Sequence, residues 1–106
     1  MKDQEKIQEL QILEQSIQNI LMQKQAFQME LSETEAALNE LGKSGDEVFK
    51  IIGQLMIKSD KSTIKEELTE KQKLFGIRMK NLEKQESSLV DQIEKLRDEI
   101  MNSSKE

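Results

Sequence analysis

The sequence DEVFKIIGQLMIKSD, residues 46–60, establishes the architecture, because the chain on either side of it has the pattern of a long helix and this stretch does not. Two runs within it, residues 48–52 and 55–58, are rich in apolar and β-branched side chains, which favour strands. Gly53 and Gln54 separate the runs, and glycine at the first central position is what a type II′ two-residue turn requires. The stretch therefore predicts a β-hairpin.

The predicted turn determines which side chains share a face of the hairpin. One face carries Val48, Lys50, Ile52, Leu55 and Ile57, and the other carries Phe49, Ile51, Met56 and Lys58. Both faces are mostly apolar, whereas a surface hairpin alternates apolar with polar residues, and a lone hairpin is marginal in water with two open edges. We therefore expect other chains to complete it. The predicted subunit-assembly residues are Val48, Phe49, Ile51, Ile52, Gly53, Leu55, Met56 and Ile57. The alternative is a hairpin folded back on its own helices.

The composition excludes several classes of protein. The 106 residues are 35% charged and 35% hydrophobic, and they contain no Pro, His or Cys. Such a chain has too few aliphatic side chains for a thick core but enough for a narrow helix seam. Imidazole and thiolate chemistry is unavailable, and the absence of cysteine is consistent with a reducing compartment. The polar start predicts no signal peptide, and apolar runs of at most three residues predict no transmembrane helix. We expect a soluble, cytoplasmic protein.

The net charge of −5 is concentrated at the start of the chain, where residues 1–41 hold three Lys against eight acidic residues. Nothing resembles a cationic groove for phosphates, so nucleic acid is not an expected partner. Helices that lie on membranes usually carry Lys or Arg on their polar face, so a membrane is not expected either.

A coiled-coil heptad runs through residues 4–42, the first predicted helix. Its two seam series are Leu10, Ile17, Lys24, Leu31 and Leu38, and Leu13, Ile20, Phe27, Thr34 and Leu41. Gly42 is expected to end the helix in the left-handed conformation. For the two polar seam residues, Lys24 is expected to reach out to solvent and Thr34 to bond back to its own helix; the alternative is that they set the register.

The second predicted helix covers residues 62–102. Ser62 or Thr63 is its expected N-cap, with Thr63 and Glu66 as a capping box. Its large apolar seam residues are Leu68, Phe75, Leu82, Leu89 and Leu96, and its second, partly polar series is Lys65, Gln72, Met79, Glu86, Ile93 and Ile100. Gly76 lies inside the helix, either to admit a neighbouring backbone or to soften the helix.

These elements define a mainly α fold: one long antiparallel coiled-coil hairpin of two helices, joined by a β-hairpin at about residues 47–59, in a single domain of residues 1–106. Both termini then share one tip, where apolar residues gather. We predict that this tip is an adaptable hydrophobic binding surface, formed by Ile7, Leu10, Ile12, Leu13, Leu96, Ile100 and Met101. The alternative is a frayed end without a ligand. Eight Gln residues on the first helix provide either solubility or a soft, uncharged lining for varied partners.

The order helix, hairpin, helix resembles the prefoldin family, and is most similar to the β-type subunit of archaeal prefoldins. The resemblance covers about residues 8–100, and the hairpin between the helices is its specific part. It is carried by QKQ at residues 23–25, MELSET at 29–34, ALNEL at 37–41, VFKIIGQLMIK at 48–58, EL at 67–68, KQ at 71–72 and LEKQE at 82–86. The α type has a second hairpin that this sequence lacks, and many relatives have Pro where this chain has Gln54.

The resemblance implies a hexamer of two α and four β subunits, in which the hairpins form a β-barrel body and the coiled coils extend from it. It also implies capture of non-native client proteins at the coiled-coil tips without ATP, and delivery to a group II chaperonin. Residues 48–58 would then be the assembly site, and the tip residues would hold clients.

Two other functions compete with that of a chaperone subunit. A coiled-coil structural scaffold or adaptor would use the hairpin only to oligomerise and would bind one native partner. An enzyme could be built on acidic clusters such as Glu33 with Glu35 or Asp46 with Glu47, but carboxylates on exposed helix faces are usually solvated. None of the four Gly residues forms a phosphate-binding loop. We therefore predict no catalytic residues, no metal and no cofactor.

Overall fold

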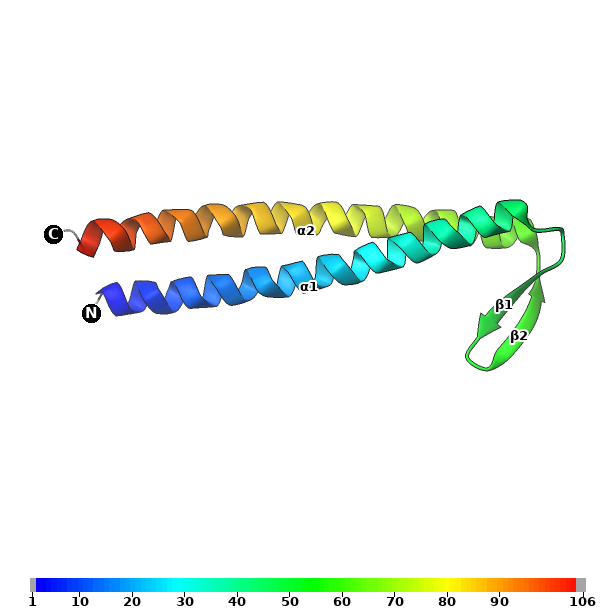
Figure 1. The fold of residues 1–106 in the computed structure, drawn as a ribbon, viewed down its shortest axis with the longest axis horizontal. Helices are drawn as coiled ribbons and strands as arrows, with labels where there is room; N and C mark the ends of the chain where they lie inside the picture. Colours follow the sequence, from blue (N-terminus) through cyan, green and yellow to red (C-terminus); the bar gives the residue numbers. More distant parts are fainter. Residues whose placement is uncertain (1, 105–106) are drawn as a thin grey trace. The chain divides into compact units, whose positions relative to one another are not determined.

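The computed structural model describes residues 2–104 and the side chains of residues 3–103. The chain runs through helix α1 (Lys2–Lys43), strands β1 (Val48–Ile52) and β2 (Leu55–Ser59), and helix α2 (Lys61–Ser104), as Figure 1 shows. This order confirms the predicted mainly α fold of two long helices joined by one hairpin. The contacts divide the chain into a terminal unit (Met1–Ala26 with Met79–Glu106) and a hairpin unit (Phe27–Arg78).

The hairpin has the predicted register. β1 pairs antiparallel with β2, so that Ile52 lies opposite Leu55 and Ile51 opposite Met56. Gly53 has a φ of 60°, and no other described residue has a positive φ. A positive φ at the first central residue alone is the pattern of a type II′ turn, whose twist matches that of the strands. The turn prediction is therefore confirmed.

The seam of the coiled coil lies where the heptad places it. In the terminal unit, Ile20 of α1 and Leu82, Ile93 and Leu96 of α2 are buried. In the hairpin unit, the rings of Phe27 and Phe75 pack with their centroids 5.6 Å apart, and Leu41 and Thr34 are buried. Every other predicted seam position is at least half-buried except Lys65, which is exposed. The apolar repeat every 3.5 residues keeps these side chains on one side of each helix.

The two polar seam residues of α1 have different roles. The Thr34 hydroxyl donates a hydrogen bond of 2.7 Å to the Glu30 carbonyl of its own helix, as predicted. Lys24 does not extend into solvent: its Nζ lies 3.0 Å from Glu86 Oε1 on α2, and only 26% and 24% of the two side chains are exposed. Because both residues occupy the seam, the ion pair holds Lys24 of α1 opposite Glu86 of α2.

The end of α1 differs from the prediction. The helix continues to Lys43, and Gly42 does not adopt a positive φ. Ser44 takes over the capping role: its backbone N–H donates to the Leu41 carbonyl at 3.3 Å, and its hydroxyl donates to the same oxygen at 2.9 Å. Because the free carbonyl is satisfied in this way, the left-handed glycine cap is not needed.

The start of α2 also differs, since the helix begins at Lys61 and not after Ser62 or Thr63. Asp60 is the capping residue: its carbonyl accepts the first helical hydrogen bond from the Ile64 N–H at 3.0 Å. Its carboxylate Oδ2 accepts hydrogen bonds from the hydroxyls of Ser62 at 2.9 Å and Thr63 at 3.4 Å. The two hydroxyls are thereby bonded to the Asp60 side chain, and the carboxylate places a negative charge at the positive helix start.

Gly53 and Gly76 should respond in opposite directions to replacement by alanine. Gly76 lies in a helix, and a Cβ added there would meet no atom within 4 Å, so Gly76→Ala should stabilise the chain by about 0.5–1 kcal/mol. Gly53→Ala should destabilise the hairpin by about 1 kcal/mol or more, because its φ of 60° is strained for alanine. Denaturant unfolding followed by circular dichroism measures both. A loss of stability in Gly76→Ala would show that another backbone packs there.

The ion pair in the seam should couple the two helices. In a double-mutant cycle of Lys24→Gln and Glu86→Gln, we expect a coupling energy of about 1 kcal/mol, because the pair is largely shielded from water. The matched control is the pair Lys6 and Glu99, which are 3.8 Å apart and more exposed, and whose coupling should be only a few tenths of a kcal/mol. Equal coupling in the two cycles would contradict the assigned role of Lys24.

Candidate functional site

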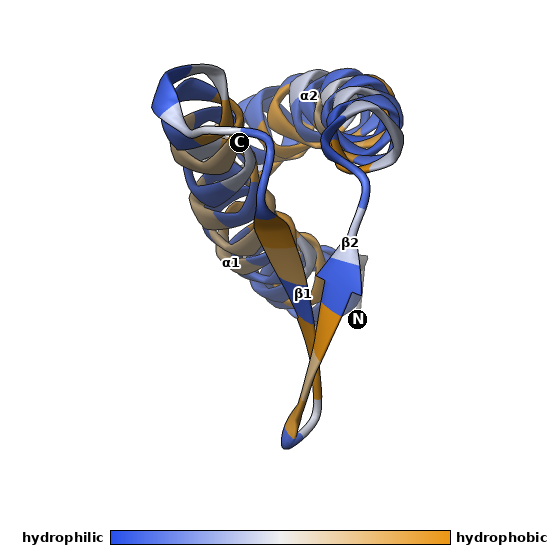
Figure 2. Ribbon diagram, turned by 90° about the vertical axis from the view of Figure 1, so that its right-hand side faces the viewer, coloured by the Kyte–Doolittle hydropathy of each residue, from blue (hydrophilic) through white to orange (hydrophobic). Residues whose placement is uncertain are grey.

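The hairpin exposes most of its hydrophobic side chains. Ile51, Leu55 and Met56 are 69%, 66% and 67% exposed, and Phe49, Ile52 and Ile57 are exposed as well. Of the eight predicted assembly residues only Val48 is buried. Figure 2 shows hydrophobic residues along both strands. The hairpin is therefore not folded flat onto its own helices, and its chain leaves both of its faces largely uncovered.

A hollow of about 480 Å³ opens between the hairpin and the adjoining helix ends of the hairpin unit. Its lining is mostly apolar and comes from α1, from α2 and from the hairpin: Ala37, Glu40, Leu41, Ser44, Glu47, Val48, Phe49, Ile51, Met56, Ile64 and Leu68. An ion pair of 3.0 Å between Lys50 Nζ and Glu67 Oε2 connects β1 to α2 in the same unit. Four of the predicted assembly residues, Val48, Phe49, Ile51 and Met56, line the hollow.

The two chain ends lie together in the terminal unit. The Ser103 hydroxyl donates a hydrogen bond of 2.7 Å to Asp3 Oδ1, and Lys6 lies 3.8 Å from Glu99. The predicted tip residues divide into three groups by exposure. Ile7, Ile12 and Met101 are exposed, Leu10, Leu13 and Ile100 are half-buried, and Leu96 is buried at 7% exposure. The exposed group forms surface, whereas Leu96 packs in the seam.

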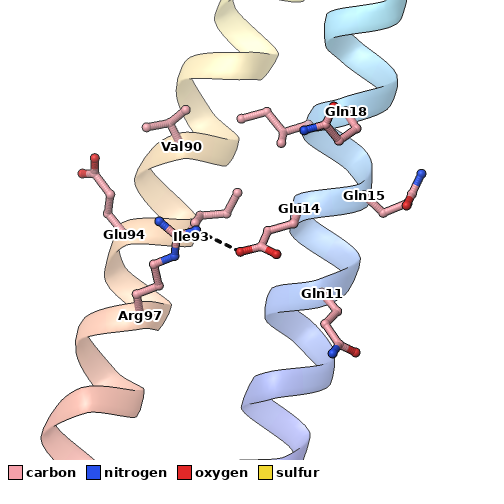
Figure 3. Close-up of a pocket in the computed structure, with 9 residues that line it drawn as sticks. Gln11, Glu14, Gln15, Gln18, Val90, Ile93, Glu94 and Arg97 are labelled. Carbon is pink, nitrogen blue, oxygen red and sulfur yellow. Dashed lines mark hydrogen bonds and ion pairs between the residues drawn. The ribbon is translucent and has the colours of Figure 1, made fainter.

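A groove in the terminal unit lies outside the residues that the sequence predicted for binding. This terminal groove, of about 560 Å³, lies between the two helices and is lined by Gln11, Glu14, Gln15, Ile17, Gln18, Val90, Ile93, Glu94 and Arg97. Figure 3 shows Arg97 reaching towards Glu14 on α1, and the Arg97 Nη2 lies 2.9 Å from Glu14 Oε1. Glu14 and Arg97 flank the seam at equivalent heptad positions of the two helices, and this is the signal that could have located the groove.

Two kinds of site are absent from the described part of the chain. No group of three or more acidic side chains among them is arranged to hold a metal ion. No helix in the described range has a stretch both long and apolar enough to cross a bilayer. The exposed large hydrophobic side chains lie on the hairpin and along both helices.

Comparison with known proteins agrees with this architecture. Residues 4–106 match the family model for a prefoldin subunit. Prefoldin subunit beta of Methanothrix thermoacetophila is 37% identical over 102 residues, which cover 94% of this chain and 85% of the relative. Prefoldin subunit beta of Thermococcus onnurineus is 35% identical over 97 residues, which cover 90% of this chain and 84% of the relative.

A solved structure shows the same fold. The crystal structure of the prefoldin beta subunit from Thermococcus strain KS-1 superposes with a TM-score of 0.89 at 32% sequence identity. The superposition covers 96% of this chain and 91% of that chain. It therefore includes both helices of this chain and the hairpin between them. On this evidence the chain belongs to the prefoldin subunit family, as a subunit of the β type.

Proposed function

We propose that the chain is a subunit of an ATP-independent molecular chaperone in the cytoplasm. It assembles through its hairpin with further β copies and an α-type subunit, in a hexamer of two α and four β chains. The complex captures non-native proteins at the paired chain ends and delivers them to a group II chaperonin. The observation that carries this proposal is the hairpin, which exposes hydrophobic side chains on both faces.

The hairpin supports assembly on energetic grounds. Full burial of an aliphatic side chain contributes roughly 1.5–3 kcal/mol, and the hairpin presents six large apolar side chains that its own chain leaves exposed. Each of its strands is five residues long and has one unpaired edge in the described sheet. Pairing with strands of neighbouring subunits satisfies these edges, and a closed barrel removes them altogether.

The terminal unit supports client capture. Ile7 and Ile12 on α1 and Met101 on α2 are exposed near the two chain ends, which lie together. Unfolded proteins expose apolar segments, and the hydrophobic attraction between such surfaces is non-directional and needs no nucleotide. A few small contacts of this kind give weak, reversible binding, which suits transfer of the client to another chaperone.

Charges placed on the hairpin should abolish assembly. The double variant Ile51→Lys with Met56→Lys introduces two positive charges into the surface that the proposal buries, so it should remain a lone chain when mixed with an α-type subunit. Size-exclusion chromatography with light scattering measures the mass, and circular dichroism confirms that helicity is retained. The control is Ile77→Lys, a similarly exposed residue on α2, which should assemble normally. Assembly of the hairpin variant would contradict the assignment.

Loss of apolar surface at the chain ends should reduce client capture without affecting assembly. For the triple variant Ile7→Ser, Ile12→Ser and Met101→Ser in the reconstituted complex, we expect at least half of the protection of a denatured test protein against aggregation to be lost. Light scattering of the test protein gives the readout. Met29→Ser, at a residue 65% exposed in the hairpin unit, is the control and should protect fully. Full protection by the triple variant would favour a coiled-coil scaffold over a chaperone.

A further inference from the structure

The terminal groove has an apolar floor, a side lined by amides and the volume of a ligand-binding pocket. Its floor is apolar, with Ile93 buried and Ile17 half-buried, and Val90, which is 37% exposed, adds apolar surface on the α2 side. On the α1 side, Gln11, Gln15 and Gln18 line it on successive turns, with the Gln15 side chain extending away from α2 (Figure 3). The volume of about 560 Å³ is within the range of pockets that hold ligands.

The amide side of the groove suits an extended polypeptide. Each Gln side chain offers a carbonyl acceptor and an NH₂ donor, which is the same pair of groups that a peptide backbone presents. Backbone groups of an unfolded segment lose water when the segment enters a groove, and they need such partners. An apolar floor beside a row of amides therefore accommodates an extended chain with apolar side chains, independent of its detailed sequence.

The charge of the groove is negative. Arg97 is neutralised by Glu14 at 2.9 Å, whereas Glu94 has no ion-pair partner among the described residues. The surroundings have the same sign. The described side chains of residues 3–14 carry four acidic groups and one Lys, and those of residues 91–103 carry four acidic groups and two basic ones. Residues 15–26 and 79–90, in the middle of the terminal unit, have no excess of acidic groups, since they carry two acidic and three basic groups.

From the amides, the apolar floor and the negative charge we infer that the terminal groove binds extended non-native segments in which Lys or Arg flanks the apolar residues. This inference rests on the proposed chaperone function and names the class of client that its terminal unit prefers. Apolar side chains of the segment occupy the floor over Ile17 and Ile93, and a flanking cation approaches Glu94. The surrounding acidic groups raise the local concentration of cationic segments and repel acidic ones, an effect that salt weakens.

Three fluorescent peptides of equal length test the inference on the reconstituted complex. They share one apolar core and differ only in its flanks, which are Lys, Ser or Glu. At about 0.05 M salt, fluorescence anisotropy should show the Lys-flanked peptide binding about fivefold tighter than the Ser-flanked one, and the Glu-flanked peptide binding weakest. At about 0.5 M salt the three affinities should converge on that of the Ser-flanked peptide.

Two charge variants locate the effect. Glu94→Lys should abolish or reverse the preference for Lys flanks, because it replaces the unpaired carboxylate of the groove. The matched control is Glu33→Lys, which makes the same change at an exposed position of α1 in the hairpin unit and should leave the preference intact. Binding of the Ser-flanked peptide by both variants shows that the apolar surface still functions.

The outcomes separate the inference from the proposed function. Equal affinity for the three peptides at low salt overturns the inference and leaves the chaperone function standing. A preference for Glu flanks, or a preference altered by Glu33→Lys but not by Glu94→Lys, overturns it as well. No binding of any peptide by the intact complex removes the proposed function, and the inference with it.

Discussion

The seam between two helices can bury only one stripe of each helix, and this limit explains why so much apolar surface is left uncovered. Ile20, Leu82 and Ile93 occupy that stripe, and it has no room for the apolar side chains elsewhere in the chain. The hairpin has no second layer from its own chain, so Ile51 and Met56 remain in contact with solvent. A chain built on such a narrow core therefore depends on other molecules to cover its remaining hydrophobic surface.

The uncovered surface differs between the two units, and so does the partner that it suits. On the hairpin it belongs to regular strands with unpaired edges, which favour specific and permanent pairing with other strands. In the terminal unit the exposed residues, such as Ile12 and Met101, are scattered among acidic groups and amides, which is consistent with the proposed weak contacts with varied sequences. Polar seam contacts, above all Lys24 with Glu86, contribute specificity to the pairing of the helices because a shift in register would separate the two charges.

Features that depend on local periodicity could be predicted from the sequence. The heptad placed Leu41 and Leu96 in the seam, and Gly53 with the alternation around it set the register of the hairpin. Helix ends were harder, because neighbouring residues of similar capping preference differ only in which hydrogen bonds the local geometry allows. Gly42 was expected to cap α1, but the Ser44 hydroxyl satisfies the free carbonyl of Leu41. Helix α2 begins at Lys61, earlier than expected, so the Asp60 carbonyl accepts its first helical hydrogen bond and the Ser62 hydroxyl bonds the Asp60 carboxylate.

The order of the residues specifies the succession of elements, the strand register and the stripe that each helix buries, because strands and helices have fixed periods that the apolar side chains follow. Which side chains meet across the seam is settled by the packing of the helices in three dimensions. Glu14 and Arg97 are 83 positions apart, and Lys24 and Glu86 are 62 apart, so their pairing depends on the axial stagger and rotation of two helices. The terminal groove arises from the same stagger, since its walls come from both helices, and no single stretch of sequence contains it.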